Sequence, residues 1–232
     1  MANGPAVILI SANSEWRVVR ARFHSADFEL SPFGECFQQE LAGVSCVFVQ
    51  GGWGKISAAA STQFAVDRWQ PDRILNLGTC GGFTGHAAKG DILLAEATLV
   101  YDIIEQMSDP QAAVEHYATR LDLTWLNEPY PLPVRRERLI SADRDILADE
   151  VPQLVARYQA VGADWESGAI AWVAACNQVR CLILRGVTDL VGVDGGEAYG
   201  NYGVFEAGTQ TVMSRLLDSL PDWLRCCYQP VF

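Results

Sequence analysis

Short apolar runs recur along the chain, and most of them end at small or polar residues that precede a stretch with helical spacing. The last run, Arg180–Arg185 (RCLILR), has a continuous apolar centre, which is typical of a strand buried on both faces. A sheet of such strands needs helices on either side. The pattern therefore predicts a mixed, mostly parallel α/β sheet with helices on both faces. The expected strands are Ala6–Ser11, Cys46–Gln50, Arg73–Leu77, Ile92–Ala95, Arg138–Ser141 and Arg180–Arg185.

Helical stretches separate these runs, and no linker-like composition divides the 232 residues. We therefore expect one domain, residues 1–232. Residues 106–137 are polar and rich in proline, so we expect a loop there, with at most one helix, that covers part of the molecule. The expected helices are Trp16–Phe23, Ile56–Trp69, Asp149–Tyr158, Gly168–Cys176 and Phe205–Leu220, and a glycine-rich loop is expected at Gly192–Gly203.

The charge of the chain argues against several classes of partner. The net charge is −11, and no basic run is longer than Arg135-Arg136. Binding to a phosphate backbone needs clustered Lys and Arg, so no nucleic acid is expected as a partner. The same acidity argues against an anionic membrane surface. The first apolar run is only a strand long and follows no basic segment, so we expect neither a signal peptide nor a transmembrane span.

The cysteines and histidines give no sign of a metal site. The cysteine count is odd and no CxxC occurs, which predicts reduced thiols and a cytoplasmic location rather than disulfides or zinc. The histidines lack ligand-like spacing, and we expect neither a metal nor a cofactor. The cysteines are at positions 36, 46, 80, 176, 181, 226 and 227, and the histidines are at 24, 86 and 116.

Two acidic residues lie where ligands bind in α/β proteins, beyond the carboxyl ends of strands. Glu166 heads an uncharged helix. It either interacts with the exposed amides of that helix or accepts hydrogen bonds from the hydroxyls of a diol. Asp189 follows the strand Arg180–Arg185. It either caps a turn or, in an apolar setting, holds a proton near neutral pH and donates it.

Two further features lie beside other strand ends. Glu15 follows the first strand and is either a surface helix residue or a member of the same site. The segment Gly78–Gly82 (GTCGG) is either a tight strand-to-helix turn or a place where the backbone approaches a ligand through Thr79, Cys80 and Gly81. Three carboxylates converging on one pocket suit a base, a sugar anchor and an acid around a glycosidic bond.

The chain also carries, in order, the segments VILISANSEW, GGWGKISAAA, NLGTCGGF, DWESGAIAWVA and RGVTDL. This combination, from about Val7 to Leu217, resembles the nucleoside phosphorylase superfamily and, within it, the 5′-methylthioadenosine/S-adenosylhomocysteine nucleosidases. The resemblance implies a three-layer α/β/α sandwich, usually a homodimer, that hydrolyses the N-ribosidic bond of a small purine nucleoside. Under it, Glu15 activates water, Glu166 holds the ribose hydroxyls, and Asp189 protonates the purine at N7.

The same resemblance favours water over phosphate as the nucleophile. Hexameric phosphorylases of the superfamily carry an arginine two residues before the GTxG glycine, and Asn76 stands at that place here. Two departures leave the substrate open: Trp165 replaces a methionine beside the sugar anchor, and Asp145 stands near the place of a purine-stacking aromatic. We count both as substrate-binding residues.

Several alternatives therefore remain. The base need not be adenine, and the 5′ group can be methylthio, homocysteinyl, deoxy or a futalosine-like extension. A phosphate-dependent phosphorylase, a futalosine-type hydrolase and a non-catalytic nucleoside-binding or storage protein are the competing functions.

Overall fold

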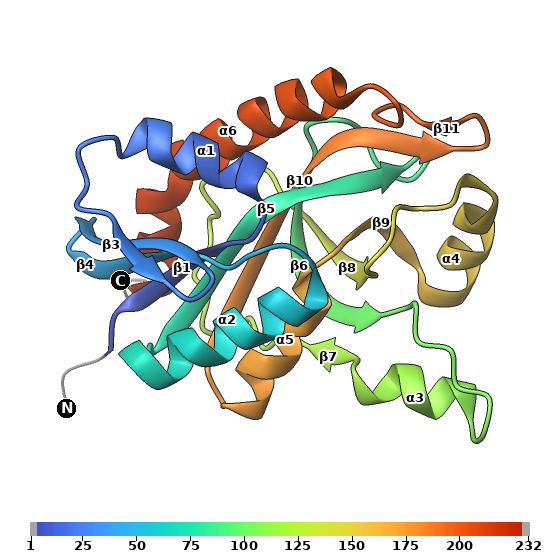
Figure 1. Cartoon of the computed structure of the whole chain (residues 1–232), viewed down its shortest axis with the longest axis horizontal. Coiled ribbons are helices and arrows are strands. Elements are labelled where there is room, and N and C mark those ends of the chain that lie inside the picture. The colour runs from blue at the N-terminus through green and yellow to red at the C-terminus, as the bar shows by residue number, and fades with distance from the viewer. Residues whose placement is uncertain (1–3, 229–232) are drawn as a thin grey trace.

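The computed structural model describes residues 4–228 and shows a mixed sheet with helices on both sides (Figure 1). The strands are β1 (Ala6–Ile10), β2 (Glu29–Ser31), β3 (Gly34–Leu41), β4 (Val44–Gln50), β5 (Arg73–Phe83), β6 (Ile92–Val100), β7 (Thr119–Arg120), β8 (Arg135–Ser141), β9 (Ala160–Asp164), β10 (Arg180–Gly192) and β11 (Gly195–Gly196). The helices are α1 (Asn13–Arg22), α2 (Gly54–Trp69), α3 (Pro110–His116), α4 (Val151–Tyr158), which follows the short 3₁₀ turn Ala148–Glu150, α5 (Ser167–Cys176) and α6 (Tyr202–Tyr228).

Two sets of parallel strands form the centre of the sheet. One set is β4–β1–β5–β10 and the other is β6–β8–β9. They meet through antiparallel pairs, β10 with β6 and β9 with β5. Because both junctions exist, each of the strands β5, β10, β6, β8 and β9 pairs with two others of this set, and together they form a closed ring. The predicted mixed sheet is confirmed, and its closure gathers the ends of several strands around the middle of β5 and β10.

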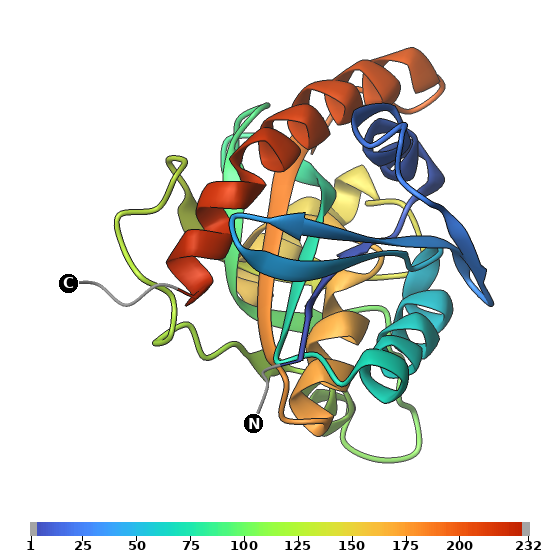
Figure 2. The same cartoon turned by 90° about the vertical axis from the view of Figure 1, so that its left-hand side faces the viewer.

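The helices form the outer layers of the predicted sandwich, which is also confirmed. Helices α1 and α6 pack together on one side, whereas α2 and α5 pack together on the other (Figures 1 and 2). Helix α6 packs closely on β10, since a Cβ at Gly186 would lie only 2.2 Å from Cγ1 of Val212. Strand β1 is fully buried between the layers, as its continuous apolar sequence predicts.

The GTCGG segment forms the second half of β5, so the strand-to-helix turn, one of the two alternatives for this segment, is wrong. Gly81 and Gly82 pair with Ala163 and Gly162 of the antiparallel strand β9. A Cβ at Gly162 would lie 2.6 Å from the carbonyl oxygen of Gly81. The glycines therefore serve a close approach of two strands rather than a turn.

Strand β10 also continues further than expected, because the strand does not end at Arg185 but runs through Asp189 to Gly192. The pairing with β5 shifts register between Val187 and Asp189, which marks a β-bulge. A bulge turns a side chain away from the regular alternation. Asp189 thus lies inside a bent strand and not in a turn after it.

Other parts of the chain differ less from expectation. Residues 106–137 hold α3 and the short strand β7, so the excursion with one helix is confirmed. The sequence did not predict β2, β3 or β9, and α6 extends beyond the expected helix at both ends. Strand β3 carries the largely exposed residues Gln38–Glu40, so it lacks the apolar run that identified the other strands.

Candidate active site

Glu15 lies in the first turn of α1 and is buried. Its Oε1 accepts hydrogen bonds from the backbone N (2.7 Å) and the hydroxyl (2.8 Å) of Thr79, and its Oε2 accepts one from the backbone N of Ala12 at 3.1 Å. Burial raises the pKa of Glu15, while the nearby guanidinium of Arg185 and these hydrogen bonds oppose the rise. The carboxyl is thus held against the middle of β5 as a stronger base than an exposed glutamate.

Glu166 immediately precedes α5 and is 8% exposed. Its Oε1 accepts a hydrogen bond of 2.9 Å from the backbone N of Gly54, the first residue of α2. Burial raises the pKa of Glu166, and the negative charges of Asp164 and Glu15 raise it further. Glu15 and Glu166 therefore lie within electrostatic reach of each other, as the sequence predicts for two members of one site.

A buried ion pair beneath these carboxyls was missed by the sequence analysis. Nε of Arg185 lies 2.7 Å from Oδ2 of Asp164, and both side chains are 2% exposed. Arg185 also donates to Oδ1 of Asn76 at 2.6 Å, and Asp164 accepts hydrogen bonds from the hydroxyls of Ser141 and Ser167. The sequence signal was an arginine inside a strand with an apolar centre, since a buried charge needs a partner.

We call Glu15, Asp164, Glu166 and Arg185 the inner cluster. It holds three acidic groups against one guanidinium. A Cβ at Gly78 would lie 3.0 Å from Oε1 of Glu15 and 3.2 Å from Nη1 of Arg185, so glycine there lets the two groups approach over β5. The surplus of acidic groups makes the inner cluster an unfavourable place for an anion.

Asp189 lies at the bulge of β10 and is 6% exposed. Within residues 4–228, the hydrogen bond to its carboxyl is donated by the hydroxyl of Thr188 at 2.6 Å. Burial raises the pKa of Asp189, and the charges of Glu197 and Asp145 raise it further. The carboxyl therefore keeps its proton to higher pH than an exposed aspartate, which suits a proton donor.

The other predicted substrate-binding residues take different positions. Thr79 commits both its amide and its hydroxyl to Glu15, so it positions that carboxyl. Cys80 is buried, and burial raises the pKa of its thiol far above the usual range. Gly81 is partly exposed and lies against Ile146, whose Cδ1 would be 2.9 Å from a Cβ at that position.

Trp165 stacks on Trp53, a residue to which the sequence assigned no role. The ring centroids are 4.7 Å apart and the planes are inclined by 21°. Trp53 precedes Gly54 and Trp165 precedes Glu166, so the stacked indoles flank the hydrogen bond between those two residues. Trp53 is 65% exposed, which leaves much of the indole available to a ligand.

Asp145 is exposed and lies near Asp189, since its charge raises the pKa of that acid. Burial raises the pKa of Tyr199, and the charges of Asp145 and Asp189 raise it further; its hydroxyl donates to the backbone O of Ile146 at 2.7 Å. Tyr199 comes from the glycine-rich loop and is 43% exposed. The sequence analysis missed it because nothing in a glycine-rich loop indicates where its aromatic residue lies. We call Asp145, Asp189 and Tyr199 the outer acid region.

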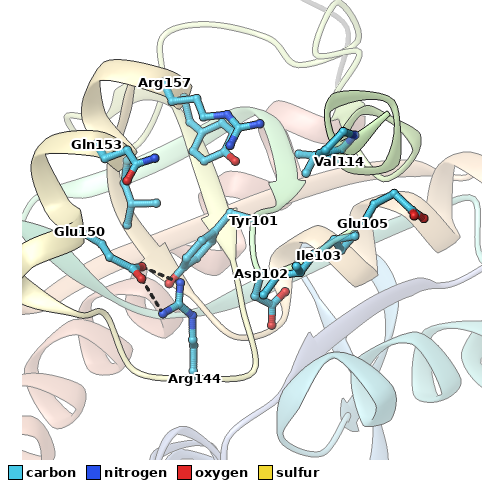
Figure 3. A pocket seen from close by; sticks show the side chains of 13 residues that line it. Tyr101, Asp102, Ile103, Glu105, Val114, Arg144, Glu150, Gln153 and Arg157 are labelled. Carbon is cyan, nitrogen blue, oxygen red and sulfur yellow. Dashed lines mark hydrogen bonds and ion pairs between the residues drawn. The ribbon is translucent and has the colours of Figure 1, made fainter. Parts of the chain in front are cut away.

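A cavity of about 590 Å³ lies beside Arg144, the chain neighbour of Asp145, and none of the predicted site residues lines it. Figure 3 shows Arg144 beside the ring of Tyr101 and paired with Glu150; the guanidinium lies 5.1 Å from the ring centroid and 2.6 Å from Oε2 of Glu150. The hydroxyl of Tyr101 is buried and has no hydrogen-bond partner in the described part of the chain. Pro110 and Val114 show that the excursion contributes to the wall. The cavity is lined by Tyr101, Asp102, Ile103, Ile104, Glu105, Pro110, Val114, Arg144, Glu150, Gln153, Leu154, Arg157 and Tyr158.

Residues 4–228 contain neither a metal-binding group nor a membrane-spanning helix. No three or more of their His, Cys, Asp or Glu side chains are placed together to hold a metal ion. None of the described helices combines the length and the apolar character that crossing a membrane requires.

The fold and the site together define an α/β protein of a known superfamily. The chain belongs to the phosphorylase superfamily, whose family model matches residues 7–220. A 5′-methylthioadenosine/S-adenosylhomocysteine nucleosidase of Tolumonas auensis is 25% identical over 180 residues, 72% of this chain and 78% of that protein. The nucleosidase of the same name from Maridesulfovibrio salexigens is 27% identical over 185 residues, covering 74% and 80%. The structure of the 5′-methylthioadenosine nucleosidase of Arabidopsis thaliana matches with a TM-score of 0.77 and 20% identity, over 99% of this chain and 98% of that one.

Proposed function

We propose that the protein is an N-glycosidase that hydrolyses the N-ribosidic bond of a purine nucleoside, of the 5′-methylthioadenosine/S-adenosylhomocysteine kind or with a related 5′ group. The observation that carries this proposal is the set of buried carboxyls of Glu15, Glu166 and Asp189 around the middle of β5 and β10. The names of the relatives support it.

In this mechanism each of the three carboxyls has a different role. Asp189, whose pKa is raised by burial, gives a proton to N7 of the purine while the bond from C1′ to the base breaks. Glu15 accepts a proton from the water whose oxygen bonds to C1′. Glu166 accepts hydrogen bonds from the ribose hydroxyls. The base then leaves as a neutral molecule.

The charge of the inner cluster supports water as the nucleophile. Arg185 is a cation near Asn76, the place at which phosphorylases carry a phosphate-binding arginine. However, Asp164 already neutralises Arg185. Glu15 and Glu166 supply no positive charge beside it, so nothing in the inner cluster is left to compensate the charge of a phosphate. A phosphate-dependent phosphorylase is therefore the weaker candidate.

The outer acid region is the part of the site that we expect to hold the purine base. We infer that Tyr199 offers the aromatic face that Asp145 lacks, because it lies near both acids of that region. The stacked pair of Trp53 and Trp165 borders the sugar anchor, where it limits the shape of the substrate. A futalosine-type hydrolase or a nucleoside-binding protein without turnover would use the same residues. The substrate assay described next distinguishes these two alternatives from the proposed nucleosidase.

A nucleoside panel tests the proposal. Release of free base is measured for adenosine, inosine, 5′-methylthioadenosine, S-adenosylhomocysteine, 5′-deoxyadenosine and futalosine, each with and without phosphate. We expect the base and the free sugar, which is ribose or its 5′-modified form, in the absence of phosphate. A sugar 1-phosphate formed only with phosphate would identify a phosphorylase. Tight binding without turnover over hours would identify a binding protein.

We also infer a homodimer and a cytoplasmic location. The dimer follows from the resemblance, and sedimentation analysis at several concentrations tests it. The location follows from the cysteine pattern, and all seven cysteines are unpaired in the structure. Fractionation of the source cells tests it.

A further inference from the structure

The first residues of α2 hold two acidic side chains from distant parts of the chain. The backbone N of Gly54 donates to Oε1 of Glu166 at 2.9 Å, and the backbone N of Lys55 donates to Oδ1 of Asp143 at 2.7 Å. Gly54 has a φ of +82°, and a Cβ there would lie 3.0 Å from Oδ1 of Asp143. Glycine is therefore required for the helix to begin in this position.

The side chain of Lys55 ties the same helix start to two further segments. Its ammonium pairs with Asp102, which follows β6, and lies 3.9 Å from Oδ2 of Asp143, which follows β8. The backbone N of Asp143 also donates to Oδ2 of Asp102 at 3.0 Å. The side chains of Lys55 and Asp102 are only 20% and 18% exposed. We call Lys55, Asp102 and Asp143 the clasp.

The clasp matters because of where Glu166 lies. Burial and the charges of Asp164 and Glu15 disfavour a charged carboxyl at that position, and the hydrogen bond from Gly54 opposes them. That bond depends on the exact place of the α2 start. Without the ammonium of Lys55, the carboxylates of Asp102 and Asp143 would repel each other and the helix start would lose its side-chain tether.

We propose that Lys55 is a positioning residue for the sugar anchor. By holding Asp102 and Asp143, it keeps the Gly54 N–H aimed at Glu166, and this orients the second carboxylate oxygen toward the ribose hydroxyls. The inference rests on the proposed sugar-binding role of Glu166. Lys55 itself contacts no reacting atom in this scheme.

The test compares nucleosides with and without the diol. With methylthioadenosine as the substrate, Lys55→Met should raise KM roughly tenfold at unchanged kcat, the size of one weakened hydrogen bond to a charged group. For the dideoxy analogue, which lacks both ribose hydroxyls, kcat/KM should not change, because that analogue makes no bond to Glu166. Lys55→Arg keeps the charge and should restore the KM. Arg136→Met, which breaks the exposed pair with Glu96, is the matched control and should leave both substrates unaffected.

Two outcomes would overturn the inference. Equal losses for the ribo and dideoxy substrates would mean a general structural role, and an unchanged KM would mean no role. If Lys55→Met does not fold, Asp102→Asn tests the clasp from its other side with the same pair of substrates. Where both single variants fold, the double variant Lys55→Met/Asp102→Asn should raise KM no more than the more impaired single variant does, because both changes break the same contact.

Assays of the wild-type protein distinguish failure of the proposed function from failure of the proposed role of Lys55. If it releases no base from any nucleoside but binds methylthioadenosine, the hydrolase proposal fails and the clasp is tested by titration calorimetry. A roughly tenfold weaker Kd in Lys55→Met, for the ribonucleoside alone, then supports the clasp. An unchanged Kd overturns it. If the wild-type protein binds no nucleoside, both proposals are wrong.

Discussion

The inner cluster and the outer acid region hold their charges in different ways. In the inner cluster, both oxygens of Glu15 accept hydrogen bonds from β5 and the start of α1, and Asp164 is bound to Arg185 and two serines. In the outer acid region, Asp189 is bound by the hydroxyl of Thr188, and its neighbours Asp145 and Tyr199 are exposed. Strands thus fix the first set of side chains, whereas a bulge and loops place the second.

This difference separates two parts of the proposed reaction. Water activation and sugar binding fall to groups that cannot move without disturbing buried charges. Recognition of the base falls to residues whose replacement disturbs little packing. Under the proposed reaction, a chain of this superfamily can therefore keep its chemistry while its base preference changes, which accords with the aspartate at position 145.

The largest effect is expected in the outer acid region, from Asp189→Asn. The variant cannot donate a carboxylic proton to the purine, so kcat should fall by about 10²- to 10⁴-fold. The fold should be retained, because an asparagine still accepts the hydrogen bond from Thr188. Base release is measured, with thermal unfolding as the check on folding. Asp145→Asn is the matched control and should lose far less activity; near wild-type turnover in Asp189→Asn would contradict the assigned acid.

A large effect on stability, rather than on chemistry, is expected in the inner cluster. Arg185→Met leaves Asp164 buried without its cation, so the free energy of unfolding should fall by about 3–5 kcal/mol. Adding Asp164→Asn should recover part of the loss, because no uncompensated charge then remains. Urea unfolding measures both variants. Equal stability of the single variant and the wild type would show that the pair is not a structural requirement.

The sequence could predict the parts of the site that depend on local pattern. The apolar runs located β1 and β10, and the acids near their ends made Glu15 and Asp189 candidates, whereas Glu166 was a candidate because it heads the uncharged helix α5. It could not predict that Arg185 pairs with Asp164, because 21 residues separate them and their approach depends on how β9 and β10 meet across β5. The same limit applies to Lys55, whose partners follow two other strands.

Strand ends were also misplaced for a physical reason. Arg185 and Gly186 interrupt the apolar run of β10, so the pattern indicated an end at Arg185, although the strand continues through a bulge between Val187 and Asp189. The glycines of Gly78–Gly82 suited either a turn or an approach to a ligand, whereas β9 and the inner cluster approach β5 closely there. In both cases tertiary contacts, which the local pattern does not contain, decided the conformation.

A medium effect, with a defined pH dependence, is expected from Glu166→Gln in the inner cluster. The pKa of Glu166 is raised in the folded protein above its ordinary value of 4.5, so ionisation above that pH destabilises the fold. The variant should therefore be more stable than the wild type by on the order of 1 kcal/mol at high pH. The difference should grow as pH rises from 4.5 through the raised pKa and vanish below 4.5. Binding of the ribose should weaken at the same time.

Urea unfolding between pH 4 and pH 9 measures this gain. Glu96→Gln, at a half-exposed residue paired with Arg136, is the control for a change of charge outside the site. A variant less stable than the wild type at high pH would mean that the charged form of Glu166 stabilises the fold. The claim that ionisation of Glu166 destabilises the fold would then be wrong.

The smallest effect is expected from Tyr199 in the outer acid region, and it decides how the base is held. Tyr199→Ala removes the ring and should raise KM by several-fold, since an aromatic contact is worth about 0.5–1.5 kcal/mol. Tyr199→Phe keeps the ring and loses only the hydrogen bond to Ile146, so its KM should stay near that of the wild type. Steady-state kinetics on the best nucleoside of the panel measures both. If the two variants were equally impaired, the hydroxyl that fixes Ile146 would be the important group, and the base would be recognised through that backbone instead of by stacking.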